Sequence, residues 1–319
     1  MLTKREIFYL NAVNIIGFLV VLIVLTSCGQ LEKAKEPKIT WVPAADVLND
    51  KANYYLQNAK LDHVGWIDET KCDGLLFNAL YAISGGSSDP MLARDEDGKW
   101  HRHPDMDCYP EGSKSSISRD MFLGLFLWVW VNKRLDVIED IVTYGEGHTD
   151  LVGNWVMGEG DVFRTTFTPG MKALAYEIRE RLGGASSSYW KYVPEVNLEQ
   201  DDFEAHLQVL KIYMIHLMRG RISQGAYDLL ESYAKQQPLN AFFQAVYHIY
   251  KDGDQNDTVK LLLDERFFPR KHMPNENDRC EFYLWQRDMP YRACPSANPK
   301  KFSGVDYLFV KAIVLGEIK

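Results

Sequence analysis

The feature that most constrains the fold is a helical spacing of apolar residues, which recurs from residue 46 almost to residue 319. Apolar residues three and four positions apart share one face of a helix, and that face must be buried against another element. The spacing predicts helices at Asp46–Ala59, Lys71–Ile83, Ser118–Asn132, Leu135–Tyr144, Gly170–Leu182, Asp202–Arg219, Gln224–Gln236, Ala241–Lys251, Asp257–Asp264 and Val305–Leu315. Residues 46–319 are therefore expected to form a single, mainly α domain.

One segment departs from the helical spacing. Residues Met91–His103 (MLARDEDGKWHRH) contain two short runs on either side of an Asp/Gly turn, a pattern typical of a β-hairpin. Elsewhere, short helices with broad apolar faces are joined by loops rich in Gly, Asp and aromatic residues, as in helical hairpins arranged around an axis. The expected architecture is either such a ring or an irregular helical bundle, with one small β-hairpin.

A resemblance bears on this choice. Residues Ser115–Trp128 (SSISRDMFLGLFLW) resemble a helix start found in (α/α) toroid proteins of the six-hairpin glycosidase and polysaccharide-lyase kind. In those proteins a polar Ser-Arg-Asp at the mouth of a helix faces a cleft, while the residues that follow pack inward. The resemblance implies an (α/α)-toroid-like fold with a carbohydrate ligand. An incomplete toroid or an irregular helical bundle would fit the same helices.

Carboxylates and aromatic side chains gather between residues 66 and 164. A carbohydrate site needs this combination, because two carboxyl groups provide acid/base catalysis and aromatic faces stack on sugar rings. The candidate catalytic residues are Asp120, Asp73 and Glu146. The candidate substrate-binding residues are the charged or polar Arg119, Arg164 and His148 and the stacking Trp100 and Trp155. The residues at helix ends are expected to converge on one concave surface.

These candidates also have structural explanations. Arg119 and Asp120 are equally typical of a buried ion pair that joins helix ends, and Tyr144–His148 (YGEGH) is equally typical of a helix that ends at glycine. His101 and His103 share one face of the expected hairpin, where solvated histidines are more common than a metal pair. We therefore expect neither a metal nor a cofactor. The sequence contains no serine-hydrolase, P-loop or dinucleotide-binding motif.

The N-terminus carries the features of an export signal. Lys4 and Arg5 precede an uncharged apolar run, Ile15–Leu25 (IIGFLVVLIVL), which is too short to span a membrane and suits the core of a signal peptide. The next residues, Leu25-Thr26-Ser27-Cys28, resemble the lipobox of bacterial lipoproteins. The resemblance implies cleavage before Cys28 and attachment of lipid to that cysteine. The alternative is an N-terminal membrane anchor with an incidental cysteine.

Lipid on Cys28 would hold the protein at a membrane of the bacterial cell envelope. In many Gram-negative bacteria an aspartate after the cysteine retains a lipoprotein at the inner membrane, whereas this chain has Gly29 there. The outer membrane is therefore favoured in a Gram-negative organism. Residues 28–45, rich in Lys, Glu and Pro, are expected to form a polar tether between the lipid and the helical domain.

Cysteine usage and charge limit the possible classes of protein. Besides Cys28, the chain has four cysteines, Cys72, Cys108, Cys280 and Cys294, an even number that favours disulfides in an oxidising compartment. The favoured bridges join Cys72 to Cys108 and Cys280 to Cys294, because each closes a segment that looks irregular and polar; four buried free thiols are the alternative. The net charge of −8 and the lack of a Lys/Arg cluster argue against nucleic-acid binding.

Two functions fit these patterns. The first is an extracytoplasmic, lipid-anchored helical protein that binds a carbohydrate and, where two carboxyl groups meet, cleaves it. The second is a non-catalytic envelope lipoprotein that acts in interaction or assembly. A cleft with two carboxylates roughly 5–9.5 Å apart would favour hydrolysis, whereas carboxylates engaged in ion pairs would favour binding.

Overall fold

The computed structural model describes residues 35–37, 44–67, 74–106, 116–157, 161–192, 205–265, 267–268, 270 and 304–319, and of residues 155–157 and 161–163 only the backbone. Several residues singled out in the sequence lie outside this part: Cys28, Asp73, Cys72, Cys108, Cys280, Cys294 and the side chain of Trp155.

Helices make up most of the described part of the chain. The α-helices are α2 (Ala45–Gln57), α3 (Gly74–Ile83), α4 (Arg119–Val131), α5 (Leu135–Gly147), α6 (Pro169–Arg181), α7 (Ala205–Arg219), α8 (Gln224–Gln236), α9 (Ala241–Lys251), α10 (Asn256–Leu263) and α11 (Val305–Val314). The described part also contains two short 3₁₀ helices, η1 (Pro90–Ala93) and η2 (Tyr189–Tyr192). It contains two strands, β1 (Leu151–Met157) and β2 (Asp161–Thr166). The prediction of a mainly α fold with one small β-hairpin is confirmed.

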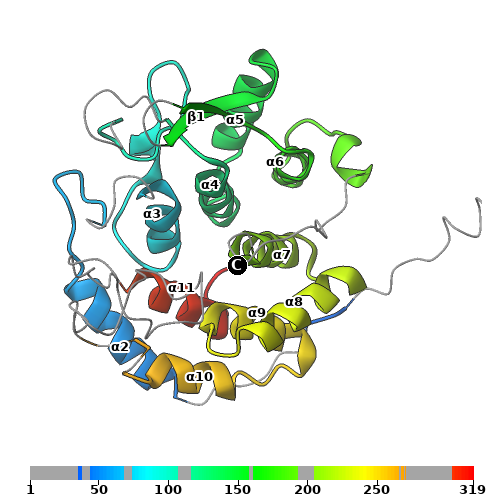
Figure 1. The fold of residues 1–319 in the computed structure, drawn as a ribbon. Helices are drawn as coiled ribbons and strands as arrows, with labels where there is room; N and C mark the ends of the chain where they lie inside the picture. The colour runs from blue at the N-terminus through cyan, green and yellow to red at the C-terminus, as the bar shows by residue number, and fades with distance from the viewer. Residues whose placement is uncertain are drawn as a thin grey trace, which may run out of the picture.

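Five helices form a closed inner ring (Figure 1). Helix α3 packs against α4, α4 against α7, α7 against α9, α9 against α11, and α11 returns to α3. The other helices of the described part lie outside this ring: α2 and α10 against α11, α8 against α9, and α5 and α6 against α4. This is the ring arrangement that the toroid-like prediction describes.

The inner helices are apolar on nearly every side, because both of their faces are covered. Every residue of Met121–Trp130 in α4 and of Val305–Val314 in α11 is buried. Phe309 of α11 lies between Tyr213 of α7, at 6.1 Å between ring centroids, and Phe242 of α9, at 5.5 Å. Among the described helices, none is long and apolar enough to cross a membrane.

The small sheet lies elsewhere than the sequence predicts. Strands β1 and β2 pair antiparallel, with Leu151 opposite Thr166 and Met157 opposite Asp161. The predicted hairpin at 91–103 instead begins with η1, because Pro90 suits the first turn of a helix and the Asp89 carboxylate accepts a hydrogen bond from the Met91 N–H. Only an isolated antiparallel bridge, between Arg94 and Trp100, follows it.

Candidate functional site

Arg119 and Asp120 begin α4 and point to different partners. The exposed Arg119 donates from Nε to the carbonyl oxygen of Thr166, at the end of β2, over 3.2 Å. The Asp120 carboxylate accepts a hydrogen bond from the Ser118 hydroxyl, and an acidic group in a first helical turn is stabilised by the helix dipole. Since Arg119 is exposed, the alternative of a buried Arg119–Asp120 ion pair is wrong.

Glu146 and His148 lie at the end of α5. That helix continues to Gly147, so Tyr144–His148 is the end of a helix, as its structural explanation stated. The Tyr176 hydroxyl donates to Glu146 over 2.5 Å. Burial, together with this bond and the charge of Glu146, raises the pKa of Tyr176 to about 12, so the phenol stays protonated at neutral pH. The His148 imidazole stacks on Tyr144 at 4.1 Å between centroids.

Phe167 brings the start of α4 and the end of α5 together. Its ring lies 5.1 Å from that of Phe122, between centroids, and so close to Gly145 that a Cβ there would lie 3.2 Å from it. Arg119 and Glu146 are thus on elements that pack together, and their convergence on one concave surface stays a prediction. The buried Phe167 joins these two elements. The carboxylates of Asp120 and Glu146 each accept a hydrogen bond from a hydroxyl group, that of Ser118 and that of Tyr176.

One other candidate, Trp100, differs from what the sequence indicates. Trp100 is only 2% exposed, so it is a core residue and not a wall on which a sugar could stack. Arg164 is exposed on β2.

The paired histidines are neither solvated nor joined by a metal site. His101 lies 2.9 Å from the Asp95 carboxylate and His103 lies 2.7 Å from that of Asp62, and both imidazoles are buried. In the residues that the structure describes, no group of three potential metal ligands occurs.

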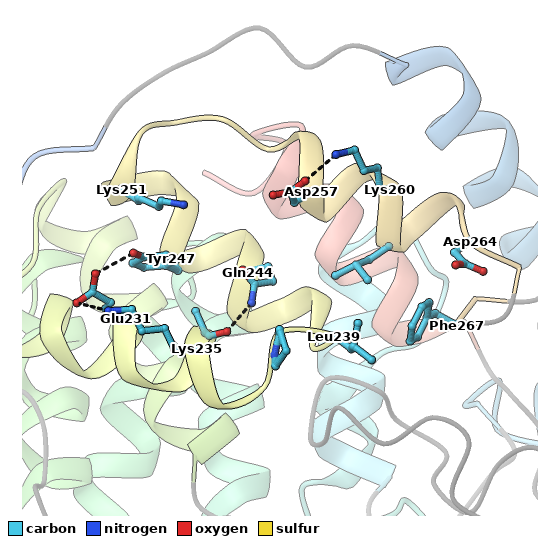
Figure 2. A pocket seen from close by; sticks show the side chains of 13 residues that line it. Glu231, Lys235, Leu239, Gln244, Tyr247, Lys251, Asp257, Lys260, Asp264 and Phe267 are labelled. Atoms are coloured by element: carbon cyan, nitrogen blue, oxygen red, sulfur yellow. Dashed lines mark hydrogen bonds and ion pairs between the residues drawn. The ribbon is translucent and has the colours of Figure 1, made fainter.

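A groove of about 860 Å³ opens between α8, α9 and α10 (Figure 2). Its lining combines aliphatic, aromatic and charged side chains: Glu231, Ala234, Lys235, Pro238, Leu239, Gln244, Tyr247, Lys251, Asp257, Lys260, Leu261, Asp264 and Phe267. Sequence reasoning missed this groove. The one sequence signal for it is the apolar Leu239 in the short connection between α8 and α9. In the structure this residue is 42% exposed.

The charged residues of the groove already have partners. Glu231 accepts hydrogen bonds from the Tyr247 hydroxyl, over 3.0 Å, and lies 3.1 Å from the Lys235 ammonium. Lys260 donates to Asp257 over 2.8 Å. The Lys235 and Tyr247 bonds lower the pKa of Glu231, and the Lys260 bond lowers that of Asp257. Both carboxylates are therefore ionised at neutral pH and poorly suited to donate a proton.

The apolar part of the groove lies at its other end in Figure 2, around Leu239 and Phe267. Leu261 of α10 adds a second aliphatic side chain there. The two aromatic rings are largely covered: Tyr247 is 6% exposed and Phe267 is also buried. The accessible apolar surface is therefore mainly aliphatic, which suits an aliphatic side chain of a ligand better than the flat face of a sugar ring.

The chain matches no protein family, no curated protein and no solved structure. Any function must therefore be inferred from its own residues. Among the described residues, the groove combines an open concave surface with an exposed apolar side chain. At the predicted site on α4 and α5, by contrast, the carboxylates of Asp120 and Glu146 already accept hydrogen bonds from Ser118 and Tyr176.

Proposed function

We propose that this protein is a lipid-anchored protein of the bacterial cell envelope that binds a segment of another envelope protein in the groove between α8, α9 and α10. The anchor is supported by the order of the N-terminal features: two positive residues, an apolar run of signal-peptide length, and the lipobox-like Leu25-Thr26-Ser27-Cys28. The residues that follow Cys28 would link the lipid to the helical domain.

The observation that carries the binding function is the exposure of Leu239 inside a concave surface. An aliphatic side chain of a partner, placed against Leu239, Leu261 and Pro238, would gain about 1.5–3 kcal/mol from burial. The surrounding carboxylates and lysines pair with one another, so they tolerate a partner backbone without leaving a charge unpaired. Binding, and not catalysis, is what ionised and paired carboxylates support.

A carbohydrate is the second candidate ligand for the same groove. At its polar end, Tyr247, Glu231 and Gln244 gather an aromatic ring, a carboxylate and an amide. Hydrogen bonds from sugar hydroxyls to these groups would bind a glycan. Cleavage would require one of the carboxyl groups to be protonated, and the lowered pKa values of Glu231 and Asp257 oppose this.

Crosslinking in intact cells tests the proposal. A photoreactive amino acid at position 239 should yield one or a few adducts of defined mass, and Leu239→Asp in an otherwise unmodified chain should abolish the partner's co-purification. The matched control is the same amino acid at Leu92, which is 46% exposed on η1 and away from the groove. Equal crosslinking at the two positions would contradict a binding groove. Glycan binding that Glu231→Gln abolishes and Leu239→Asp spares would establish the carbohydrate instead.

A further inference from the structure

The tether joins the helical domain at the connection between α7 and α8. Lys35 and Ile222 form an isolated antiparallel bridge, with backbone hydrogen bonds of 2.9 and 3.3 Å. The Lys35 ammonium lies 4.3 Å from the centroid of the Tyr227 ring of α8. Only six residues lie between Cys28 and Lys35, and the seven steps from one to the other span at most about 25 Å in an extended chain.

The helix η2 lies at this same end of the molecule. Its Trp190 donates from the indole N–H to Glu180 over 2.8 Å. The guanidinium of Arg219, the last residue of α7, lies 5.4 Å from the centroid of the Trp190 ring. Because Arg219 is only three residues from Ile222, the tether and η2 both contact the C-terminal end of α7.

The exposed side chains of η2 are amphipathic aromatics next to a lysine. Tyr192 is 83% exposed and Tyr189 is 36% exposed. Lys191 lies between them in sequence, and its ammonium is 5.3 Å from the Trp190 ring. Tyrosine and tryptophan, with an apolar body and a polar tip, are the residues that collect at the boundary between a membrane and water.

Among the described residues at this end, basic side chains outnumber acidic ones. The basic residues of η2, of its contacts and of the tether junction are Lys35, Lys172, Arg181, Lys191, Arg219 and Arg221, and the acidic ones are Glu36, Glu177 and Glu180. Glu177 is buried and pairs with both Arg181 and Arg219, so its one carboxylate offsets only one of these two positive charges.

We propose that this end of the protein, formed by Tyr189–Tyr192 with Arg181, Arg219 and Arg221, rests on the headgroups of an anionic phospholipid bilayer. The inference relies on the lipid anchor of the proposed function, which would hold the tether junction within about 25 Å of the membrane. A tether of that length lets this end of the protein reach the membrane surface, where tyrosine rings enter the headgroup region and basic side chains are attracted to anionic lipid. The groove between α8, α9 and α10 would then face a partner beside or above the membrane.

Hydrogen exchange on the protein purified from membranes of expressing cells tests this orientation. Reconstituted in vesicles that contain phosphatidylglycerol, the protein should exchange the amide hydrogens of residues 189–192 several-fold more slowly than in pure phosphatidylcholine vesicles. Lys191→Glu should remove that difference. Lys60→Glu, an equal charge reversal at an exposed position after α2, should leave it unchanged.

The outcomes separate the two proposals. Protein that does not associate with either kind of vesicle would show that the anchor is absent, and the orientation would fall with it. Protein that associates with both, but exchanges residues 189–192 equally fast in both, would overturn the orientation and leave the anchor standing. Slowing by a soluble anionic polysaccharide, without vesicles, would replace the membrane surface with a glycan site.

Discussion

Asp62 joins two turns that are distant in sequence. Its carboxylate accepts hydrogen bonds from the backbone N–H groups of Val64 and Trp66, over 3.0 and 2.9 Å, and lies 2.7 Å from Nε2 of His103. Burial by itself raises the pKa of Asp62, but the bonds from His103, Trp66 and Val64 outweigh it, so the pKa is lowered from 3.8. The ionised form of this side chain therefore stabilises the folded protein.

Asp62→Asn should destabilise the protein near neutral pH by about 1–3 kcal/mol, because it removes the charge from a nearly buried hydrogen-bonding group. Since the folded pKa is depressed, the contribution is present above the unfolded value and is lost as pH falls through the folded value. Urea denaturation should therefore show a gap between the two proteins at about pH 7 that narrows at about pH 3. Glu96→Gln, at an exposed position, is the control. A gap of constant size would contradict this account.

The helices were readily predicted from the sequence, since each bound in the described part agrees to within three residues. An apolar stripe is a local property of the sequence, so a helix can be predicted from it without knowing which helices it packs against. The β-hairpin was placed wrongly because Pro90 and Asp89 begin a 3₁₀ helix at the predicted segment, whereas the observed strands β1 and β2 pair further along the chain, with Met157 opposite Asp161.

The groove was missed for a related reason. Its lining comes from three helices and the connection between α8 and α9, so it exists only after those helices pack. Conversely, Asp120 and Glu146 were predicted as site residues because they are carboxylates at helix ends. The Ser118 hydroxyl that bonds Asp120 is close in sequence, whereas the Tyr176 hydroxyl that bonds Glu146 is distant in sequence and could be found only in the structure. The sequence indicates which residues are polar, but not which of them are already bonded.

The contact between α3 and α4 depends on a glycine. A Cβ at Gly124 would lie 2.9 Å from both the Cα and the carbonyl oxygen of Leu76, which belong to the backbone and cannot rotate away. Gly124→Ala should therefore lower the unfolding midpoint, with a cost of about 1–3 kcal/mol that exceeds the gain in helix propensity. Gly147→Ala, in open space at the end of α5, should not lower it. Equal thermal melts of the two variants would refute the close approach.

At the scale of the whole molecule, attachment to a membrane should depend on one sulfur atom. Cys28→Ser should remove acyl labelling and leave the protein uncleaved or released from the membrane fraction, because the several acyl chains of a bacterial lipoprotein give stable retention. Fractionation of cells fed a labelled fatty acid measures both effects. Cys72→Ser is the control and should keep the label. Normal labelling of the Cys28→Ser protein would exclude this cysteine as the site.

Helix α11 closes the ring with residues from the far end of the sequence. The Tyr307 hydroxyl donates to the carbonyl oxygen of Leu48, and Lys311 to the side chain of Asn49, across 259 and 262 residues. The apolar faces of α3 and α9 that α11 covers therefore stay uncovered until α11 has been synthesised. The ring cannot close before that helix is available, and until then these faces can aggregate.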